Sequence, residues 1–286
     1  MYAEILNDYS VDEVVQICKY LNKEYNIYEP DAVRWEKIKY IFYKTPNNTF
    51  EKLQEQTFSN EFINGLLLKF YACERIVKYH FINFLRNGVH DIVAFEMSIG
   101  DSRIDICRIN GELCAYEIKT EYDNYDRLQS QMQDYLKAFE KVYIIVPRKN
   151  SIAVQEHIPH ECGIITYRLD KNDDMVFFYK RSAQKNICDI SFCLKSLSNN
   201  DLIKMIKLLQ LKPLKTKREN LDMLLNLSGK KDLWSAYKCF LKEKYQEQWI
   251  YLKNNFENIL PIDCQSFFSS KMDPDILYER EKNKKR

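Results

Sequence analysis

A change of hydrophobic period between residues 92 and 146 constrains the fold of this chain more than any other feature. Three segments alternate like strands, at 92–99, 103–109 and 112–119, and a fourth lies at 142–146. A helical pattern from about Asn124 to Glu140 separates the third strand from the fourth. Adjacent strands joined by tight turns run antiparallel, whereas a strand–helix–strand connection produces a parallel pair. We therefore predict an α/β protein with a mixed sheet.

Helical patterns precede and follow this sheet. Ser59 is expected to cap a long helix that reaches Leu85, and Arg86-Asn87-Gly88 end it. Two further strands are expected at 163–169 and 175–182, and helical spacing returns from Ser198. The expected regions are a helical N-terminal region at 1–58, a core at 59–190 and a helical, basic region at 191–286.

Composition limits the class of protein. The 286 residues are 45% hydrophobic, which is enough to bury a sizeable core. No apolar run is long enough for a transmembrane helix, and the first residues lack the basic segment of a signal peptide. The nine cysteines are scattered with no CxxC pair, so we expect reduced thiols and a cytoplasmic protein with no membrane partner.

Charged residues interrupt two of the expected core strands. Glu117 and Lys119 lie two apart in an apolar strand, so their side chains share one face. Asp105 lies between Ile104 and Ile106 in the preceding strand. Charges in such places are costly to bury unless they are paired or bind a metal. A structural salt bridge between Glu117 and Lys119 is the simpler alternative.

The turn between these strands decides whether the acids meet. A two-residue Asn110–Gly111 turn would pair Ile109 with Glu112 and put Asp105 and Glu117 on opposite faces. A three-residue loop with Gly111 at positive φ would pair Arg108 with Glu112. Asp105 would then lie opposite Ala115, diagonal to Glu117 and on its face. The sequence permits both turns.

Two more acids occur in apolar surroundings. Glu96 interrupts the first strand. Glu74 falls in line with an apolar helical stripe made of Leu67, Phe70, Tyr71, Val77 and Phe81. Four inward acids with one inward lysine exceed what a core tolerates without a function. Carboxylate ligands of this kind suit Mg²⁺ or Mn²⁺.

The ordered set of these residues resembles the PD-(D/E)XK nuclease superfamily. The set is Glu74, Glu96, Arg103-Ile104-Asp105, Glu117-Ile118-Lys119 and Gln131-Met-Gln-Asp-Tyr135. The Gln-x-x-x-Tyr element looks like the RecB-like, Holliday-junction-resolvase-like branch. The resemblance covers about residues 70–147. It departs from the family pattern at Ile104, which stands where the namesake motif has proline.

This resemblance implies a restriction-endonuclease-like core and a role for each matching residue. Asp105, Glu117 and the Ile118 carbonyl would hold Mg²⁺ or Mn²⁺, and Lys119 would position or activate the attacking water. Glu74 and Glu96 often join such a site. Gln131 and Tyr135 would support the site and the DNA strand, and we assign Arg103 to nucleic-acid binding.

The last third of the chain is basic. Residues 195–286 hold 19 Lys and Arg against 12 Asp and Glu, a net charge of +7, whereas residues 1–194 have a net charge of −5. Residues 196–227 resemble the helix–extended-loop–helix of SAP-type DNA-binding modules. The residues assigned to nucleic-acid binding there are Lys212, Lys215, Lys217 and Arg218. The alternative is a helical hairpin that packs on the core.

We expect a cytoplasmic, Mg²⁺-dependent nuclease that hydrolyses phosphodiester bonds, with DNA as its partner. Defence, repair or mobile-element processing would be typical of the resemblance. The alternative is a catalytically inactive nucleic-acid-binding or protein-interaction member of the same fold.

Overall fold

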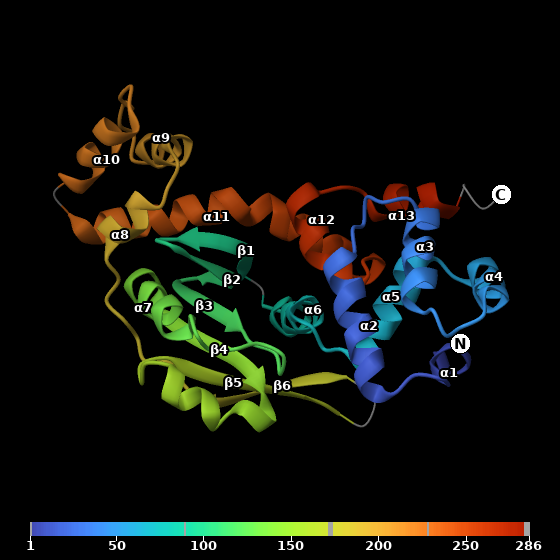
Figure 1. The fold of residues 1–286 in the computed structure, drawn as a ribbon. Helices are drawn as coiled ribbons and strands as arrows, with labels where there is room; N and C mark the ends of the chain where they lie inside the picture. Colours follow the sequence, from blue (N-terminus) through green and yellow to red (C-terminus); the bar gives the residue numbers. More distant parts are fainter. Residues whose placement is uncertain (1, 89, 171–173, 228, 283–286) are drawn as a thin grey trace. The chain divides into compact units, whose positions relative to one another are not determined.

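The computed structural model describes residues 2–88, 90–170, 174–227 and 229–282. The chain forms two compact units, one from residues 1–80 with 251–286 and one from residues 81–250 (Figure 1). The division falls inside two continuous helices, α6 (Glu74–Leu85) and α11 (Lys230–Asn255). This grouping differs from the expected division at residues 58 and 190, because the last residues of the chain group with the N-terminal helices.

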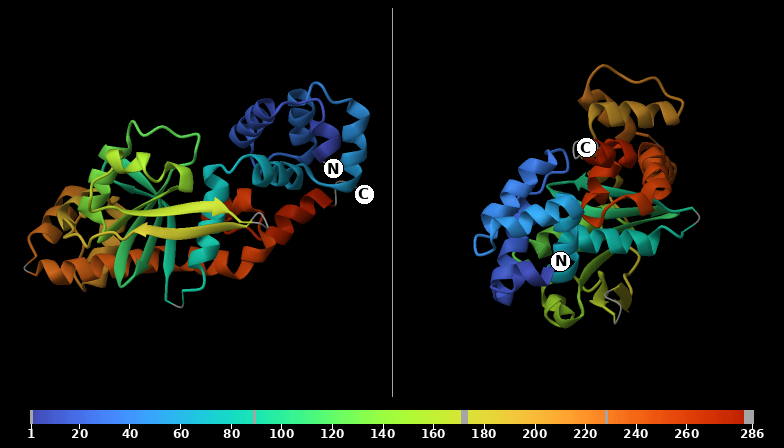
Figure 2. Two further views of the ribbon diagram at one scale, coloured as in Figure 1. Left: turned by 90° about the horizontal axis from the view of Figure 1, so that it is seen from below. Right: turned by 90° about the vertical axis from the view of Figure 1, so that its right-hand side faces the viewer.

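The second unit is built on a six-stranded mixed sheet in the order β1-β2-β3-β4-β5-β6. The strands are β1 (Ile92–Ile99), β2 (Ser102–Asn110), β3 (Glu112–Ile118), β4 (Lys141–Pro147), β5 (Gly163–Leu169) and β6 (Met175–Arg181). β1, β2 and β3 run antiparallel, β3, β4 and β5 run parallel, and β6 is antiparallel to β5. The prediction of an α/β protein with a mixed sheet flanked by helices is therefore confirmed (Figure 2).

Helices cover both faces of this sheet. The crossover helix α7 (Leu128–Ala138) buries Leu128, Met132 and Tyr135, and Tyr135 reaches Glu117 on β3. On the other face Phe81 of α6 packs on Tyr116, with 4.9 Å between ring centroids. Because adjacent strand residues point to opposite faces, these two contacts assign α7 and the end of α6 to different sides of the sheet.

The remaining elements of the second unit follow the sheet. They are the short 3-10 helices η1 (Arg148–Asn150) and η2 (Ala153–His157), and the helices α8 (Ile190–Lys195), α9 (Asn199–Leu208) and α10 (Lys217–Leu225), with α11 up to Ile250. Ser198 caps α9 as expected, since its hydroxyl accepts a hydrogen bond from the Asp201 N–H. α11 runs along the sheet (Figures 1 and 2), and its Lys238 donates to the Gly111 carbonyl at 2.6 Å.

The first unit is helical. Its elements are α1 (Tyr2–Leu6), α2 (Val11–Glu24), α3 (Asp31–Ile41), α4 (Asn47–Gln56), α5 (Ser59–Phe70), the start of α6, the end of α11, η3 (Phe256–Asn258), η4 (Pro261–Asp263), α12 (Cys264–Ser270) and α13 (Pro274–Lys282). The two ends of the chain pack together, because the Tyr25 hydroxyl donates to Asp263 and Lys78 donates to Gln265. Across the described part of the chain, every helix is too short or too polar to span a bilayer.

The prediction of one long helix from Ser59 to Leu85 is wrong. Helix α5 ends at Phe70, Tyr71 is extended with φ −151° and ψ 87°, and α6 begins at Glu74. The expected cap is also wrong, because Ser59 is the first residue of α5. The Ser59 N–H and hydroxyl both donate to Asp31 at 2.7 Å, so a side chain distant in sequence caps this helix.

The turn between β2 and β3 matches neither alternative. Asn110 pairs with Glu112, and Cys107 lies opposite Ala115, so the predicted pairing of Arg108 with Glu112 is wrong. Gly111 nevertheless has φ 68°, as predicted for the bulged loop. The same register puts Asp105 directly opposite Glu117, on one face of the sheet.

Candidate metal and phosphodiester site

Three acids lie in one row across the first three strands. The pairs Phe95–Ile106 and Met97–Ile104 flank Glu96, so this register puts Glu96 opposite Asp105. Asp105 in turn is opposite Glu117 by the register of β2 and β3. Directly opposed residues of antiparallel strands have Cβ atoms about 5 Å apart. The antiparallel hairpins therefore bring together three acids that are separated by up to 21 positions in the sequence.

Asp105 and Glu117 are both buried. Asp105 retains 8% of its exposure, and Glu117 retains 3%. The Asp105 Oδ2 accepts a 2.7 Å hydrogen bond from the Ile118 N–H, just beyond the last backbone pair, Ile106–Tyr116. The carboxylate thus takes the place of a backbone acceptor where β2 and β3 separate. This bond fixes the Asp105 side chain beside the end of β3.

The Lys119 ammonium contacts one side chain of β3 and one of α7. Its Nζ lies 2.9 Å from Glu117 Oε1 and 3.3 Å from Gln131 Oε1. Burial lowers the pKa of Lys119, but the carboxylates of Glu117, Asp105 and Asp123 outweigh it, so the pKa is raised above its ordinary value. Lys119 is therefore a cation at neutral pH.

The two polar residues of α7 both reach the β3 motif. Gln131 and Tyr135 are one turn apart on the same helix face. Gln131 accepts from Lys119, while the Tyr135 hydroxyl lies 3.0 Å from Glu117 Oε2 and 2.9 Å from the Arg103 carbonyl. Burial, followed by the Glu117 carboxylate, raises the pKa of Tyr135, so its hydroxyl keeps the proton.

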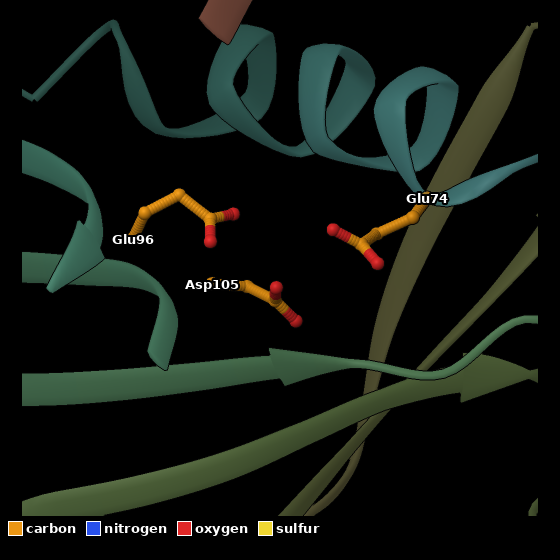
Figure 3. A group of neighbouring side chains, drawn as sticks. All are labelled: Glu74, Glu96 and Asp105. Atoms are coloured by element: carbon orange, nitrogen blue, oxygen red, sulfur yellow. The ribbon is translucent and has the colours of Figure 1, made fainter. Parts of the chain in front are cut away.

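Glu96 has an unusual backbone. Its φ is 53°, in the left-handed region, although it lies within a strand and is not glycine. Such a residue costs about 1–3 kcal/mol of strain, and these residues concentrate at functional sites. Glu96 and Asp105 each offer a carboxylate oxygen, and these two atoms lie within 4.8 Å of each other (Figure 3). Glu96 also pairs with Arg103, with 2.6 Å between Nε and Oε2.

Glu74 belongs to the first unit. It is the first residue of α6, and its carboxylate lies 2.6 Å from the ammonium of Lys78. Val77 and Phe81 share its helix face, whereas Leu67, Phe70 and Tyr71 precede the break before α6. The expected apolar stripe around Glu74 is thus shorter than predicted. Its participation in the site stays a prediction.

A cleft beside Lys119 was not predicted. It measures about 580 Å³ and is lined by Lys119, Tyr122, Asp123, Asn124, Asp126, Arg127 and Gln131. Its loop is held in place, because Asp123 accepts from the Thr120 N–H and hydroxyl, and Lys149 pairs with Glu121. The only signal in the sequence is that the loop directly follows Lys119.

The donor atoms fit a hard divalent cation. Carboxylate oxygens from Glu96, Asp105 and Glu117 are ligands that Mg²⁺ and Mn²⁺ prefer. The Glu96 and Asp105 oxygens are already within 4.8 Å, close to the span of one coordination sphere. Ile118, whose carbonyl is the other expected ligand, ends β3, and its N–H is held by Asp105.

The residues assigned to nucleic-acid binding lie in two places. Lys212, Lys215, Lys217 and Arg218 are all exposed, in the loop between α9 and α10 and at the start of α10. Buried Asn220 orders this loop, since it accepts from the Leu214 N–H and donates to the Leu214 carbonyl. The fifth, Arg103, lies in the sheet at the candidate site.

Comparison with known proteins gives a family. Protein cII of Enterobacteria phage P4 is 32% identical over 66 residues, which is 23% of this chain, and the match spans about a quarter of that relative's length. A solved structure of a protein of unknown function from Silicibacter pomeroyi is 17% identical, with a TM-score of 0.29 over 40% of this chain and 71% of that chain. The family model described as bacteriophage P4 protein cII matches residues 69–266, and that range includes the whole sheet and α7. Since the match extends over more than half of the sequence, the chain belongs to the bacteriophage P4 protein cII family.

Proposed function

We propose that this protein is a metal-dependent nuclease that hydrolyses phosphodiester bonds of DNA, with a restriction-endonuclease-like core. One observation carries the proposal. Glu96, Asp105 and Glu117 lie in one row on adjacent strands, and Lys119 lies 2.9 Å from the last of them. This row combines hard oxygen ligands for a divalent ion with a fixed cation, and a divalent ion can promote phosphodiester hydrolysis.

The residues of the site have separate roles in this proposal. Asp105, Glu117 and Glu96 would hold the ion, together with the Ile118 carbonyl. When bound, the ion would acidify a coordinated water and offset the charge that develops on the phosphate. Lys119 orients the nucleophile and adds positive charge; its raised pKa argues against service as a general base at neutral pH.

The α7 residues hold Lys119 and Glu117 in position. Gln131 accepts from the Lys119 ammonium, which restricts where that cation can point. Tyr135 donates to Glu117 and keeps its own proton. Since catalytic groups must be fixed within about half an ångström, these contacts from one helix favour a preorganised site.

A purely structural ion pair explains the site less well. One acid would suffice to neutralise Lys119, yet three acids share the row. Glu96 also pairs with Arg103, whose side chain is 68% exposed. Neighbouring carboxylates repel one another, and burying them costs several kcal/mol unless cations compensate their charge. A bound divalent ion provides that compensation.

The DNA contacts of the proposal lie on the loop and helix start after α9. Lys212, Lys215, Lys217 and Arg218 are exposed on an element that Asn220 orders. Charges of this kind contact phosphates without reading sequence. The basic surface therefore supplies affinity, and the acidic row supplies the chemistry.

A cleavage assay tests the proposal. Supercoiled, linear and branched DNA are incubated with the purified protein in Mg²⁺, Mn²⁺ or EDTA. Cleavage that needs the divalent ion and disappears in the Asp105→Asn variant is the expected result. Ion-independent or unchanged cleavage in that variant would refute the assignment. DNA binding without any cleavage in Mg²⁺ or Mn²⁺ would favour the alternative, an inactive nucleic-acid-binding member of the fold.

A charge-matched pair of variants tests the basic surface. Changing Lys212, Lys215 and Lys217 to Ala should weaken DNA binding and flatten its salt dependence by up to about 0.9 log units per lost phosphate contact. The control changes exposed Lys23, Lys52 and Lys69 of the first unit to Ala, which removes the same charge. If DNA binding had the same salt dependence in the two triple variants, the proposed DNA-binding role of the α9–α10 region would be wrong.

A further inference from the structure

We infer that the Arg103 guanidinium acts as a latch on Glu96: the guanidinium pairs with the Glu96 carboxylate until a divalent cation takes its place. The displaced guanidinium then binds a phosphate of the substrate. The inference rests on the proposed function, because it assumes that Glu96 belongs to the ion site. It adds a coupling between ion loading and substrate binding, and it assigns that coupling to a single side chain.

The contact itself is the first support. Arg103 Nε lies 2.6 Å from Glu96 Oε2. Glu96 is 20% exposed at its side chain, whereas Arg103 is 68% exposed. The guanidinium is thus the more solvent-exposed partner of this pair. A cation approaching Glu96 from solvent must compete with Arg103 for that oxygen.

The backbone is the second support. By register Glu96 is opposite Asp105, and Arg103 lies two residues before Asp105 on the same strand face. The positive φ of Glu96 is strain that a plain surface ion pair does not need. The Glu96 oxygen that lies within 4.8 Å of an Asp105 oxygen shows that this backbone directs the side chain toward the site.

The energetics allow the exchange. Ion pairs as exposed as Arg103–Glu96 are weak, so a doubly charged ion with a second carboxylate ligand can displace the guanidinium. The backbone of Arg103 stays at the site, because Arg103 belongs to β2 and its carbonyl lies 2.9 Å from the Tyr135 hydroxyl. A displaced guanidinium next to the row of acids would then lie where the substrate phosphate must come. Its planar donors suit phosphate oxygens.

The first test measures ion binding without DNA. Mn²⁺ affinity is determined by titration calorimetry for the parent, Arg103→Gln, Glu96→Gln and the double variant. Arg103→Gln should bind Mn²⁺ about two- to fivefold more tightly, since the competitor is gone. That gain should disappear in the Glu96→Gln background. A gain of equal size in both backgrounds would overturn the latch, because it would reflect general electrostatics only.

The second test measures DNA binding in the cleavage-silenced Lys119→Ala background. Adding Arg103→Gln should weaken duplex binding about three- to tenfold in Mn²⁺ and leave it unchanged in EDTA. The control is Lys137→Gln, which removes an exposed cation that pairs with Asp134 rather than Glu96. Equal losses with and without the ion, or a loss matched by Lys137→Gln, would overturn the inference.

The two proposals fail in different ways. If the parent protein binds no Mn²⁺ in the calorimeter, the ion site itself is absent, and the nuclease assignment fails together with the latch. If Mn²⁺ binds and DNA is cleaved, but Arg103→Gln changes Mn²⁺ affinity equally with and without Glu96→Gln, only the latch fails.

Discussion

Two buried carboxylates, one in each unit, differ in how their charge is balanced. Asp263 in the first unit is fully buried and accepts from the hydroxyls of Tyr25 and Tyr278, both at 2.8 Å. Glu117 in the second unit also accepts from a tyrosine, Tyr135, but it pairs with Lys119 and lies in a row of acids. The two hydroxyls that donate to Asp263 are neutral, whereas Glu117 also forms a direct ion pair with Lys119.

The difference separates a structural acid from a functional candidate. Burial raises the pKa of Asp263 to about 6, although its tyrosine partners, Arg34 and Arg75 act to lower it. Asp263 joins the two ends of the chain within the first unit, and its hydrogen bonds account for its presence. Glu117 has acids beside it and a cleft beside Lys119, which a structural role leaves unexplained. An acid in apolar surroundings is thus insufficient evidence for a site; the arrangement of its neighbours decides.

The largest expected effect is on activity. Asp105→Asn should reduce the proposed metal-dependent cleavage by at least about a thousandfold, because it removes a charge from the proposed ion site. The fold should persist, since an amide oxygen can still accept from the Ile118 N–H. Asp263→Asn is the matched control, and its cleavage rate should equal that of the parent at a temperature where both are folded. Similar losses of cleavage rate in both variants would contradict the distinction between a structural acid in the first unit and functional acids in the second.

The sequence predicted the sheet well because its signals are local. Short apolar runs rich in β-branched and aromatic residues predicted all six strands, and the predicted limits of the first, 92–99, match β1. Glu117, Lys119, Gln131 and Tyr135 converge as their spacing along one strand and one helix requires. The hairpin register was not predictable, because one residue more or less in the turn changes the pairing without changing the strand pattern.

The second expected effect is on stability. Asp263→Ala should lower the free energy of unfolding by roughly 3 kcal/mol, because it leaves two tyrosine hydroxyls without their buried acceptor and opens a cavity. Chemical denaturation of Asp263→Ala, Asp263→Asn and the parent measures this. Asp263→Asn keeps the shape and one acceptor, so it should lose much less. A loss below about 1 kcal/mol for the alanine variant would contradict a structural role for Asp263.

The third expected effect is a pH dependence that belongs to the first unit. The folded pKa of Asp263, about 6, exceeds the unfolded value of 3.8, so the folded state holds its proton more tightly. As pH rises from 4 to 7, the free energy of unfolding of the parent should therefore fall by roughly 2–3 kcal/mol relative to that of Asp263→Asn. Denaturation at several pH values checks the sign. A difference that is constant over this range would mean that Asp263 has the same pKa in both states.

The parts that the sequence failed to predict depend on contacts distant along the chain. Tyr25 and Asp263 are 238 positions apart, and no spacing rule joins them. The break between α5 and α6 was missed because apolar spacing continues through Tyr71 while the backbone turns. The Asp31 side chain, which caps α5, comes from 28 residues earlier. Tertiary contacts, rather than local propensity, fix these features.

The smallest expected effect compares two tyrosines that each donate to a buried acid. Tyr25→Phe leaves Asp263 with Tyr278, and the loss should be about 1–2 kcal/mol of stability, with no change in ion binding. Tyr135→Phe should cost about 1 kcal/mol or less, because Lys119 still pairs with Glu117. The same change should alter Mn²⁺ affinity, since it removes a donor that competes for the Glu117 carboxylate. Denaturation and calorimetry on both variants separate the roles. If Tyr25→Phe changed Mn²⁺ affinity as much as Tyr135→Phe, Asp263 and Glu117 would not differ in the way proposed. The assignment of Glu117 as an ion ligand would then be wrong.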